Sequence, residues 1–128
     1  MTRYVIDAYA WIEYLDGSSR GAKVRDLLEN PANTILTSAI TLAELVSKSL
    51  RAKRDPKTAI KAVESNSTLN PISFALASLA GEVHAEEKKR KKDFGLADAL
   101  VLATARNRSC KVLTGDPHFK DVPEAIMI

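Results

Sequence analysis

Short apolar runs alternate with helix-like segments along nearly the whole chain, and this alternation limits the folds that the chain can adopt. Apolar runs of this length between turn residues are typical of buried strands, and the segments between them have helical spacing. Strands that alternate with helices connect through right-handed crossovers, which bury a parallel sheet between two helical layers. The sequence therefore predicts a three-layer α/β/α sandwich with a central, mostly parallel sheet of four to five strands.

The expected elements can be placed from their flanking turn residues. We expect strands at residues 3–7, 33–38 and 111–116, a short strand or extended link at 69–73, and a last strand at 124–128. We expect helices at residues 8–15, 18–30, 39–53, 56–65, 74–92 and 96–107. The helix at 39–53 presents an apolar face made of Ile40, Ala43, Val46 and Leu50.

The composition is that of one soluble globular domain. The chain has 128 residues, of which 45% are hydrophobic and 27% charged, so residues 1–128 can form one domain with its own core. The single cysteine, Cys110, excludes an intramolecular disulfide and a cysteine-based zinc cluster. The N-terminus lacks a signal-peptide pattern, and no window approaches the roughly 18 apolar residues that span a bilayer. We therefore expect a cytoplasmic protein with no membrane contact.

The charge balance permits a nucleic-acid partner without demanding one. The chain has 19 Lys and Arg residues against 16 Asp and Glu residues, for a net charge of +3. Basic residues are clustered at positions 48–54 and 88–92, whereas several acidic residues are isolated among apolar neighbours in the sequence. These isolated acids carry the functional interpretation, because an unpaired carboxylate is costly to bury.

The first isolated acid, Asp7, stands where an apolar strand meets a helix. Aspartate is among the best helix N-caps, so capping alone explains it. A cation ligand explains it equally well, because sites in parallel α/β folds form beyond the carboxyl ends of the strands. Asp116 follows another such strand end, although Gly-Asp-Pro is also ordinary turn chemistry.

Two further acids have structural alternatives of their own. Thr41 and Glu44 have the spacing of a capping box, and Glu44 forms an i,i+4 pair with Lys48. Asp98 has no basic neighbour one helical turn away, so if buried it needs a partner, a proton or a cation. It is a helix cap instead if its helix begins late, after Gly95.

A bound cation explains the four acids together, whereas capping explains them one at a time. All four lie near expected strand ends and can face one cleft: Asp7, Glu44, Asp98 and Asp116. Two carboxylates about 4 Å apart repel by roughly 4 kcal/mol at an effective dielectric constant of about 20. Such a cluster persists at neutral pH only with raised pKa values or a bound cation. Oxygen ligands without a Cys or His cluster suit Mg²⁺ or Mn²⁺.

Four stretches, in this order and spacing, resemble the PIN-domain nucleases, and most of all the VapC-type ribonuclease toxins of toxin–antitoxin pairs. They are YVIDAYAWIEYL, TSAITLAEL, LADALVLATA and VLTGDPHF, and the resemblance covers essentially the whole chain. It implies that the four acids are catalytic: Asp7, Asp98 and Asp116 as metal ligands, and Glu44 as a ligand, direct or through water.

The resemblance also bears on two neighbouring residues. Thr114 matches a hydroxyl position that supports the site. Tyr9 departs from the family pattern, because many members have a small hydroxyl residue two places after the first acid.

The resemblance further implies a metal-dependent endoribonuclease. One or two Mg²⁺ or Mn²⁺ ions would activate a water for in-line attack on an RNA phosphodiester, leaving 5′-phosphate and 3′-hydroxyl ends. It also implies a cognate antitoxin protein and a homodimer. Lys48 and Arg51 are candidate RNA contacts, because they share a helix with Glu44.

The remaining candidates have ordinary structural explanations. The run EEKKRKKD at residues 86–93 can contact phosphates, but a solvated helix end with the i,i+4 pairs Glu86–Arg90 and Glu87–Lys91 explains it too. His84 and His118 are interpreted as isolated, with no ligand spacing. Trp11 is assigned to the core or to a dimer contact.

Two other function classes compete with the nuclease interpretation. A phosphoacceptor domain also places Asp at a strand end, but it requires a second acid within two residues or an acid after the third strand. Here Ala8 and Tyr9 follow Asp7, and residues 69–73 contain no acid. A non-catalytic binding module would use the four acids only in caps and turns.

Overall fold

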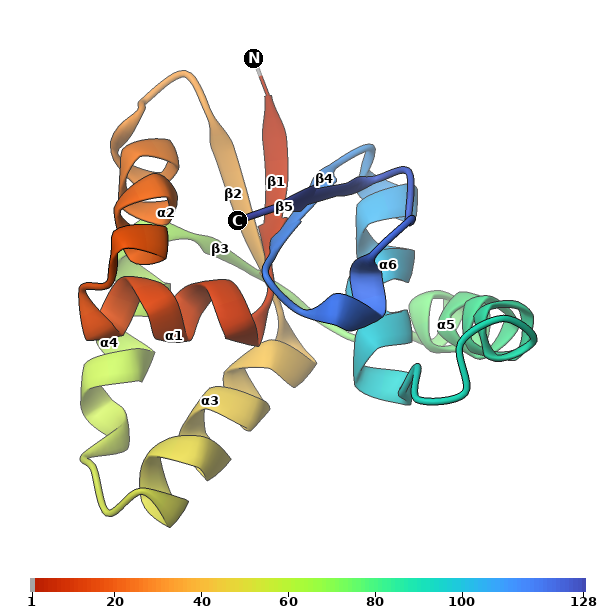
Figure 1. The fold of residues 1–128 in the computed structure, drawn as a ribbon, viewed down its shortest axis with the longest axis horizontal. Helices are drawn as coiled ribbons and strands as arrows, with labels where there is room; N and C mark the ends of the chain where they lie inside the picture. The colour runs from red at the N-terminus through yellow and green to blue at the C-terminus, as the bar shows by residue number, and fades with distance from the viewer. Residues whose placement is uncertain (1) are drawn as a thin grey trace.

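The computed structural model describes residues 2–128, which form a five-stranded sheet in the order β3-β2-β1-β4-β5 (Figure 1). Every neighbouring pair of these strands is parallel, so the expected sheet is confirmed with five strands. The strands are β1 (Arg3–Ile6), β2 (Thr34–Ser38), β3 (Thr68–Asn70), β4 (Lys111–Thr114) and β5 (Ala125–Met127).

Six α-helices and one 3₁₀ helix connect the strands, and the α-helices correspond to the six expected ones with small shifts at their ends. They are α1 (Ala8–Asp16), α2 (Ser19–Glu29), α3 (Ala39–Arg51), α4 (Pro56–Asn66), α5 (Phe74–Lys88), α6 (Leu96–Arg108) and the 3₁₀ helix η1 (Pro117–Phe119). The largest difference is at α5, which ends at Lys88 instead of residue 92. None of the helices within residues 2–128 is long and apolar enough to cross a membrane.

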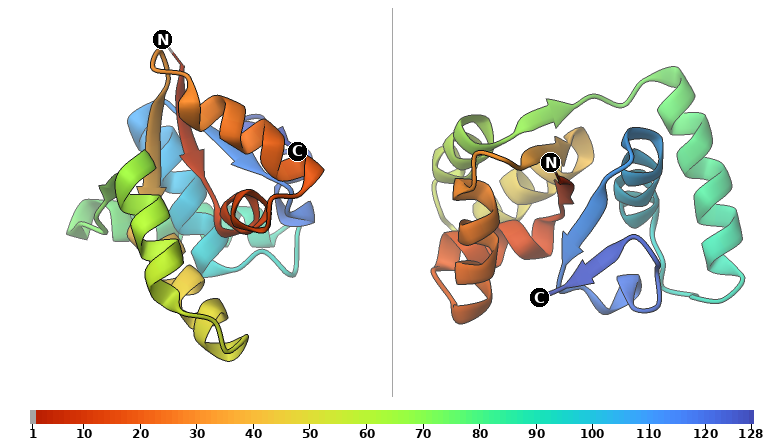
Figure 2. Two further views of the ribbon diagram at one scale, coloured as in Figure 1. Left: turned by 90° about the vertical axis from the view of Figure 1, so that its left-hand side faces the viewer. Right: turned by 90° about the horizontal axis from the view of Figure 1, so that it is seen from above.

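The two faces of the sheet bury two separate hydrophobic clusters, because successive side chains of a strand point to opposite faces. Val5, Leu36 and Val112 face α5 and α6. Tyr4, Ile6 and their neighbours on β2 and β4 face α1 to α4. Figures 1 and 2 show these two helical layers on opposite sides of the sheet. The three-layer sandwich is therefore confirmed.

The chain changes direction at the centre of the sheet. From β1 it moves outward through β2 to β3, and it then returns to place β4 on the other side of β1. In open parallel sheets, ligands bind at such a reversal, beyond the carboxyl ends of the strands. The amide of Asp7 donates to the carbonyl of Leu113 at 3.3 Å, so the pairing of β1 with β4 extends up to Asp7.

The expected apolar face of α3 is not its buried face. The structure buries Thr41 and Leu45, whereas Leu50 of the expected face is 59% exposed. The periodicity of α3 fits two apolar stripes, and contacts with α1 and α4 decide which of them faces the core. Trp11 is fully buried and donates from Nε1 to Thr37 Oγ1 at 3.2 Å, which confirms its assignment to the core.

The basic run after α5 forms ion pairs, but not the expected ones. Because the helix ends at Lys88, the pairs are Glu86–Lys89 at 3.0 Å and Glu87–Arg90 at 2.9 Å, three residues apart instead of four. Lys91 Nζ donates to the carbonyl oxygen of His118 at 2.9 Å. The run therefore supports the turn after β4.

We predict that Gly21→Ala destabilises the fold at the contact between α1 and α2. A Cβ atom at this position would lie 2.0 Å from the carbonyl oxygen of Glu13, which is backbone and cannot move aside. We expect a loss of about 1–3 kcal/mol in the free energy of unfolding, measured by urea denaturation.

The matched control is Gly81→Ala in α5, where an added Cβ would have no neighbour within 4 Å apart from the adjoining backbone of its own helix. We expect it to gain about 0.5–1 kcal/mol, because Ala is the better helix former. Equal effects of the two substitutions would contradict the close approach of α1 and α2.

Candidate metal centre

The four acids expected to act together line one small cavity of about 80 Å³. The cavity lies where β1 and β4 end and where α1, α3, α6 and η1 begin (Figure 1). It has room for an ion with some of its waters. Its acids are Asp7, Glu44, Asp98 and Asp116. The structure thus brings together all four acids that the sequence analysis selected.

Asp7 caps α1 and also lines the cavity. Its Oδ1 accepts a hydrogen bond from the amide of Ala10 at 2.9 Å, which confirms that Asp7 is the N-cap residue of α1. Its side chain is buried, and burial is the main reason why its pKa rises from 3.8 to about 7. The hydrogen bonds from Thr114 and Ala10 oppose this rise, and the charges of Asp116 and Asp98 add to it.

Thr114 links the two strand-end acids. Its hydroxyl donates to Asp7 Oδ2 and accepts a hydrogen bond from the amide of Asp116 at 2.9 Å. Thr114 is fully buried at the end of β4. It therefore connects the two acids through hydrogen bonds.

Glu44 projects into the cavity from the second turn of α3. The helix begins at Ala39 with Ser38 as its N-cap residue, so the capping box of Thr41 and Glu44 is not formed. Burial raises the pKa of Glu44, Lys48 lowers it, and the charges of Asp98 and Asp116 raise it further. Lys48 also lines the cavity, whereas Arg51 lies one turn later at the exposed end of α3.

Asp98 and Asp116 also combine capping with a place in the cavity. Asp98 lies in the first turn of α6, and its Oδ2 accepts from the amide of Gly95 at 3.0 Å. Asp116 caps η1, because its Oδ1 accepts from the amide of His118 at 2.9 Å. The helix begins at Leu96 with Gly95 as its N-cap residue, so Asp98 contributes to the cap from the third helical position and is not the N-cap residue itself.

His118 is the residue that the sequence analysis missed, and its interpretation as isolated was wrong. Its Nδ1 lies 2.9 Å from Asp98 Oδ2 and 3.4 Å from Asp116 Oδ1. A two-residue spacing from Asp116 was the only signal, and it gives no hint of Asp98, which is twenty positions away. His84 lies elsewhere, with its Nε2 3.0 Å from the carbonyl oxygen of Phe94.

Tyr9 fills the position where the resemblance suggested a small hydroxyl residue. Its ring forms part of the cavity wall and packs so closely over Gly115 that a Cβ there would lie 2.2 Å from Tyr9 Cε1. Its hydroxyl accepts a hydrogen bond from Arg20. Tyr9 therefore shapes the cavity with its ring.

The arrangement suits a divalent cation. Four carboxylates face one cavity, and those of Asp7 and Glu44 have raised pKa values because burial and mutual repulsion disfavour their charged forms. A bound cation reverses both effects, since it offsets the charge and replaces the lost hydration. Carboxylate oxygens are the ligands that Mg²⁺ and Mn²⁺ accept.

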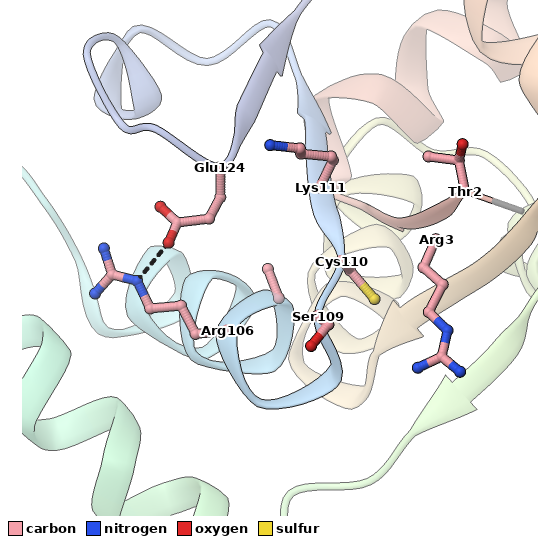
Figure 3. Close-up of a pocket in the computed structure, with 8 residues that line it drawn as sticks. Thr2, Arg3, Arg106, Ser109, Cys110, Lys111 and Glu124 are labelled. Atoms are coloured by element: carbon pink, nitrogen blue, oxygen red, sulfur yellow. Dashed lines mark hydrogen bonds and ion pairs between the residues drawn. The ribbon is translucent and has the colours of Figure 1, made fainter.

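A larger concave surface, of about 590 Å³, lies at the opposite end of the sheet (Figure 3). Its acid, Glu124, is paired with Arg106, whose Nε lies 2.9 Å from Glu124 Oε2. Arg3 and Lys111 make the surface basic, and its lining residues include no cluster of carboxylates. Volume alone would indicate this surface as the functional site. The grouped carboxylates with raised pKa values indicate the acidic cavity instead.

Comparisons with known proteins identify a family and a set of similar structures. A family model described as "PIN domain" matches residues 4–125. Similar solved structures include a chain of the VapBC2 complex from Rickettsia felis, bound to a DNA fragment from its promoter (21% identity, 99% of this chain and 98% of that chain, TM-score 0.77). Another is VapC20 of Mycobacterium tuberculosis, described as a sarcin–ricin loop cleaving toxin (18% identity, 94% and 95%, TM-score 0.74).

A third similar structure is a chain of DNA-bound VapBC from Salmonella typhimurium (22% identity, 100% of this chain and 98% of that chain, TM-score 0.73). At these identities the structural likeness establishes the fold. A comparison with curated protein sequences gives no match.

We predict that Asp7 makes the metal-free protein less stable as the pH rises from about 4 to 7. Below this range both the folded and the unfolded chain hold the proton. Within it the unfolded chain has lost the proton and the folded chain retains it, because burial raises the pKa of Asp7 to about 7. The total loss is roughly 4 kcal/mol at most, and it persists at higher pH.

The measurement is the free energy of urea unfolding in EDTA at several pH values, for the wild type and Asp7→Asn. We expect a flatter pH profile for Asp7→Asn. Asp26→Asn, at an exposed site on α2, should follow the wild type. Parallel profiles for all three proteins would contradict the raised pKa of Asp7.

Proposed function

The chain belongs to the PIN domain family, and from this premise we propose that it is a metal-dependent endoribonuclease, the toxin of a VapBC-type toxin–antitoxin pair. The observation that carries the proposal is the cavity in which Asp7, Glu44, Asp98 and Asp116 meet at the reversal of the strand order. Further support comes from the similar structures, which include VapC20, described as a sarcin–ricin loop cleaving toxin.

Each acid has a proposed role. Asp7, Asp98 and Asp116 are the main ligands of one or two Mg²⁺ or Mn²⁺ ions, and Glu44 binds directly or through a water that it helps to orient. When bound, the ion supplies an activated water and offsets charge on the phosphoryl oxygens and the leaving alkoxide. Thr114 holds Asp7 and Asp116 in place, since its hydroxyl bonds to both residues.

The RNA would enter across the C-terminal part of α3. Lys48 lines the acidic cavity and so can reach a phosphate next to the scissile bond, and Arg51 extends the positive charge one helical turn further. The exposed charges of these two side chains also offset the repulsion between RNA and the carboxylates. Residues 86–93 have no assigned RNA contact, because Glu86, Glu87 and the carbonyl oxygen of His118 engage Lys89, Arg90 and Lys91 of this run.

We propose a cognate antitoxin protein as the partner, in the cytoplasm. The support is that similar structures from Rickettsia felis and Salmonella typhimurium are toxin–antitoxin complexes. An apolar groove of about 260 Å³ between α1 and α3 offers a place for such a partner. Lys48 lines both this groove and the acidic cavity, so a protein bound in the groove would lie next to the cavity.

We predict that the purified chain cleaves RNA in the presence of Mn²⁺ or Mg²⁺ and that Asp98→Asn lowers the rate by at least about a hundredfold. Asp98 is a suitable target because its loss removes one carboxylate without opening the core. The assay follows cleavage of a structured RNA on a gel and identifies the 5′ ends by their phosphate.

Asp26→Asn is the matched control, because it makes the same chemical change at an exposed position away from the cavity. It should cleave at the wild-type rate after the same purification. Equal cleavage by wild type and Asp98→Asn would indicate a contaminant or another site. RNA binding without cleavage by the wild type would support the alternative, a non-catalytic PIN-like binding module.

We also predict a homodimer that involves the start of α5. Phe74 is 95% exposed at the first position of this helix, and Leu69 in the edge strand β3 and Ile72 in the link to α5 are exposed as well. Light scattering during gel filtration should give twice the mass of one chain, and Phe74→Glu should lower it to that of one chain. Met127→Glu, on the opposite edge strand, should remain dimeric, and a monomeric wild type would contradict the prediction.

A further inference from the structure

His118 places a nitrogen atom between two carboxylates at the rim of the acidic cavity. One ligand atom from each of Asp98, Asp116 and His118 lies within 4.8 Å of the other two. His118 Nδ1 is 2.9 Å from Asp98 Oδ2 and 3.4 Å from Asp116 Oδ1. His118 is not among the residues that line the cavity, whereas both aspartates are. The two aspartates therefore face the cavity and the imidazole.

The backbone holds His118 in this place. Its amide donates to Asp116 Oδ1 at 2.9 Å, and its carbonyl oxygen accepts from Lys91 Nζ at 2.9 Å. The next residue, Phe119, is buried in the core against Phe94. A side chain on so firmly held a turn is positioned in advance for binding.

The spacing of the three groups matches that of ligands around one ion. Adjacent ligands of an octahedral ion at 2.1 Å are about 3.0 Å apart. The two distances from His118 Nδ1, 2.9 and 3.4 Å, are close to this value. Nδ1 of His118 forms a hydrogen bond with Asp98 Oδ2. When the proton is on Nε2 instead, Nδ1 directs a lone pair along the same line and can bind an ion.

We propose that Asp98, Asp116 and His118 form a second cation site at the rim of the cavity, and that this site selects a first-row transition ion over Mg²⁺. Mg²⁺ binds through oxygen ligands and waters, whereas imidazole nitrogen suits transition ions. The cavity offers only carboxylates, so the two positions differ in the ions that they favour. This inference rests on the proposed function in one respect: the proposed nuclease site and the rim site share Asp98 and Asp116 as ligands.

The direct test is pulsed electron paramagnetic resonance of Mn²⁺ bound to the full chain, which detects nitrogen bonded to the ion. The sequence has two histidines, so each serves as the control for the other. We expect ¹⁴N coupling in the wild type and in His84→Gln, and its loss in His118→Gln. Wild type labelled with ¹⁵N-histidine should show the ¹⁵N pattern instead, which assigns the nitrogen without any substitution.

Titration with each metal gives a second readout. His118→Gln should weaken Mn²⁺ binding by at least about tenfold and change Mg²⁺ binding by less than about twofold. Equal losses for both metals would mean that His118 only orients Asp98, and would overturn the proposal. Coupling that is absent from the wild type, or that persists in His118→Gln, would overturn it too.

These measurements contain no RNA, so the two proposals can fail separately. Mn²⁺ bound without nitrogen coupling rejects the rim site and leaves RNA cleavage possible. Nitrogen coupling in a protein that cleaves no RNA retains the rim site and rejects the nuclease.

Discussion

The buried carboxylate of Asp7 is the constraint around which this end of the molecule is built. It lies at the end of the central strand β1, where hydration is lost and two other acids are near, so its pKa rises to about 7. The chain partly compensates with two hydrogen bonds, from the amide of Ala10 and the hydroxyl of Thr114. These bonds do not restore the ordinary pKa of Asp7, and the remaining imbalance is what a cation would remove.

Helix starts supply much of the order at this site. Asp7 caps α1, Asp98 bonds to the amide of the N-cap residue of α6, and Asp116 caps η1. Backbone N–H groups at helix starts carry partial positive charge, which favours carboxylates there. Capping and cation binding are therefore compatible roles for one residue, and a capping explanation for each acid does not argue against a metal centre.

Two of the four acids were predictable because they broke a local pattern, and Glu44 and Asp116 were selected by their places after expected strands and by the family resemblance. Asp7 and Asp98 interrupt apolar stretches, and such interruptions in a core element require a specific compensation. His118 broke no pattern, since a histidine after Gly-Asp-Pro is ordinary in a turn. Its position against Asp98 depends on how α6 packs beside β4, and that packing involves residues far apart in the chain. The buried face of α3 was missed for the same reason.

The sequence by itself determined the alternation of strands and helices, and with it the parallel sheet and the edge of the sheet where the acids lie. These properties follow from local periodicity and from the handedness of crossovers. Only the tertiary structure decided which strands are neighbours, which stripe of α3 is buried, and that His118 meets Asp98. Those outcomes depend on contacts between segments that are far apart in the sequence. Local periodicity carries no information about the energies of such contacts.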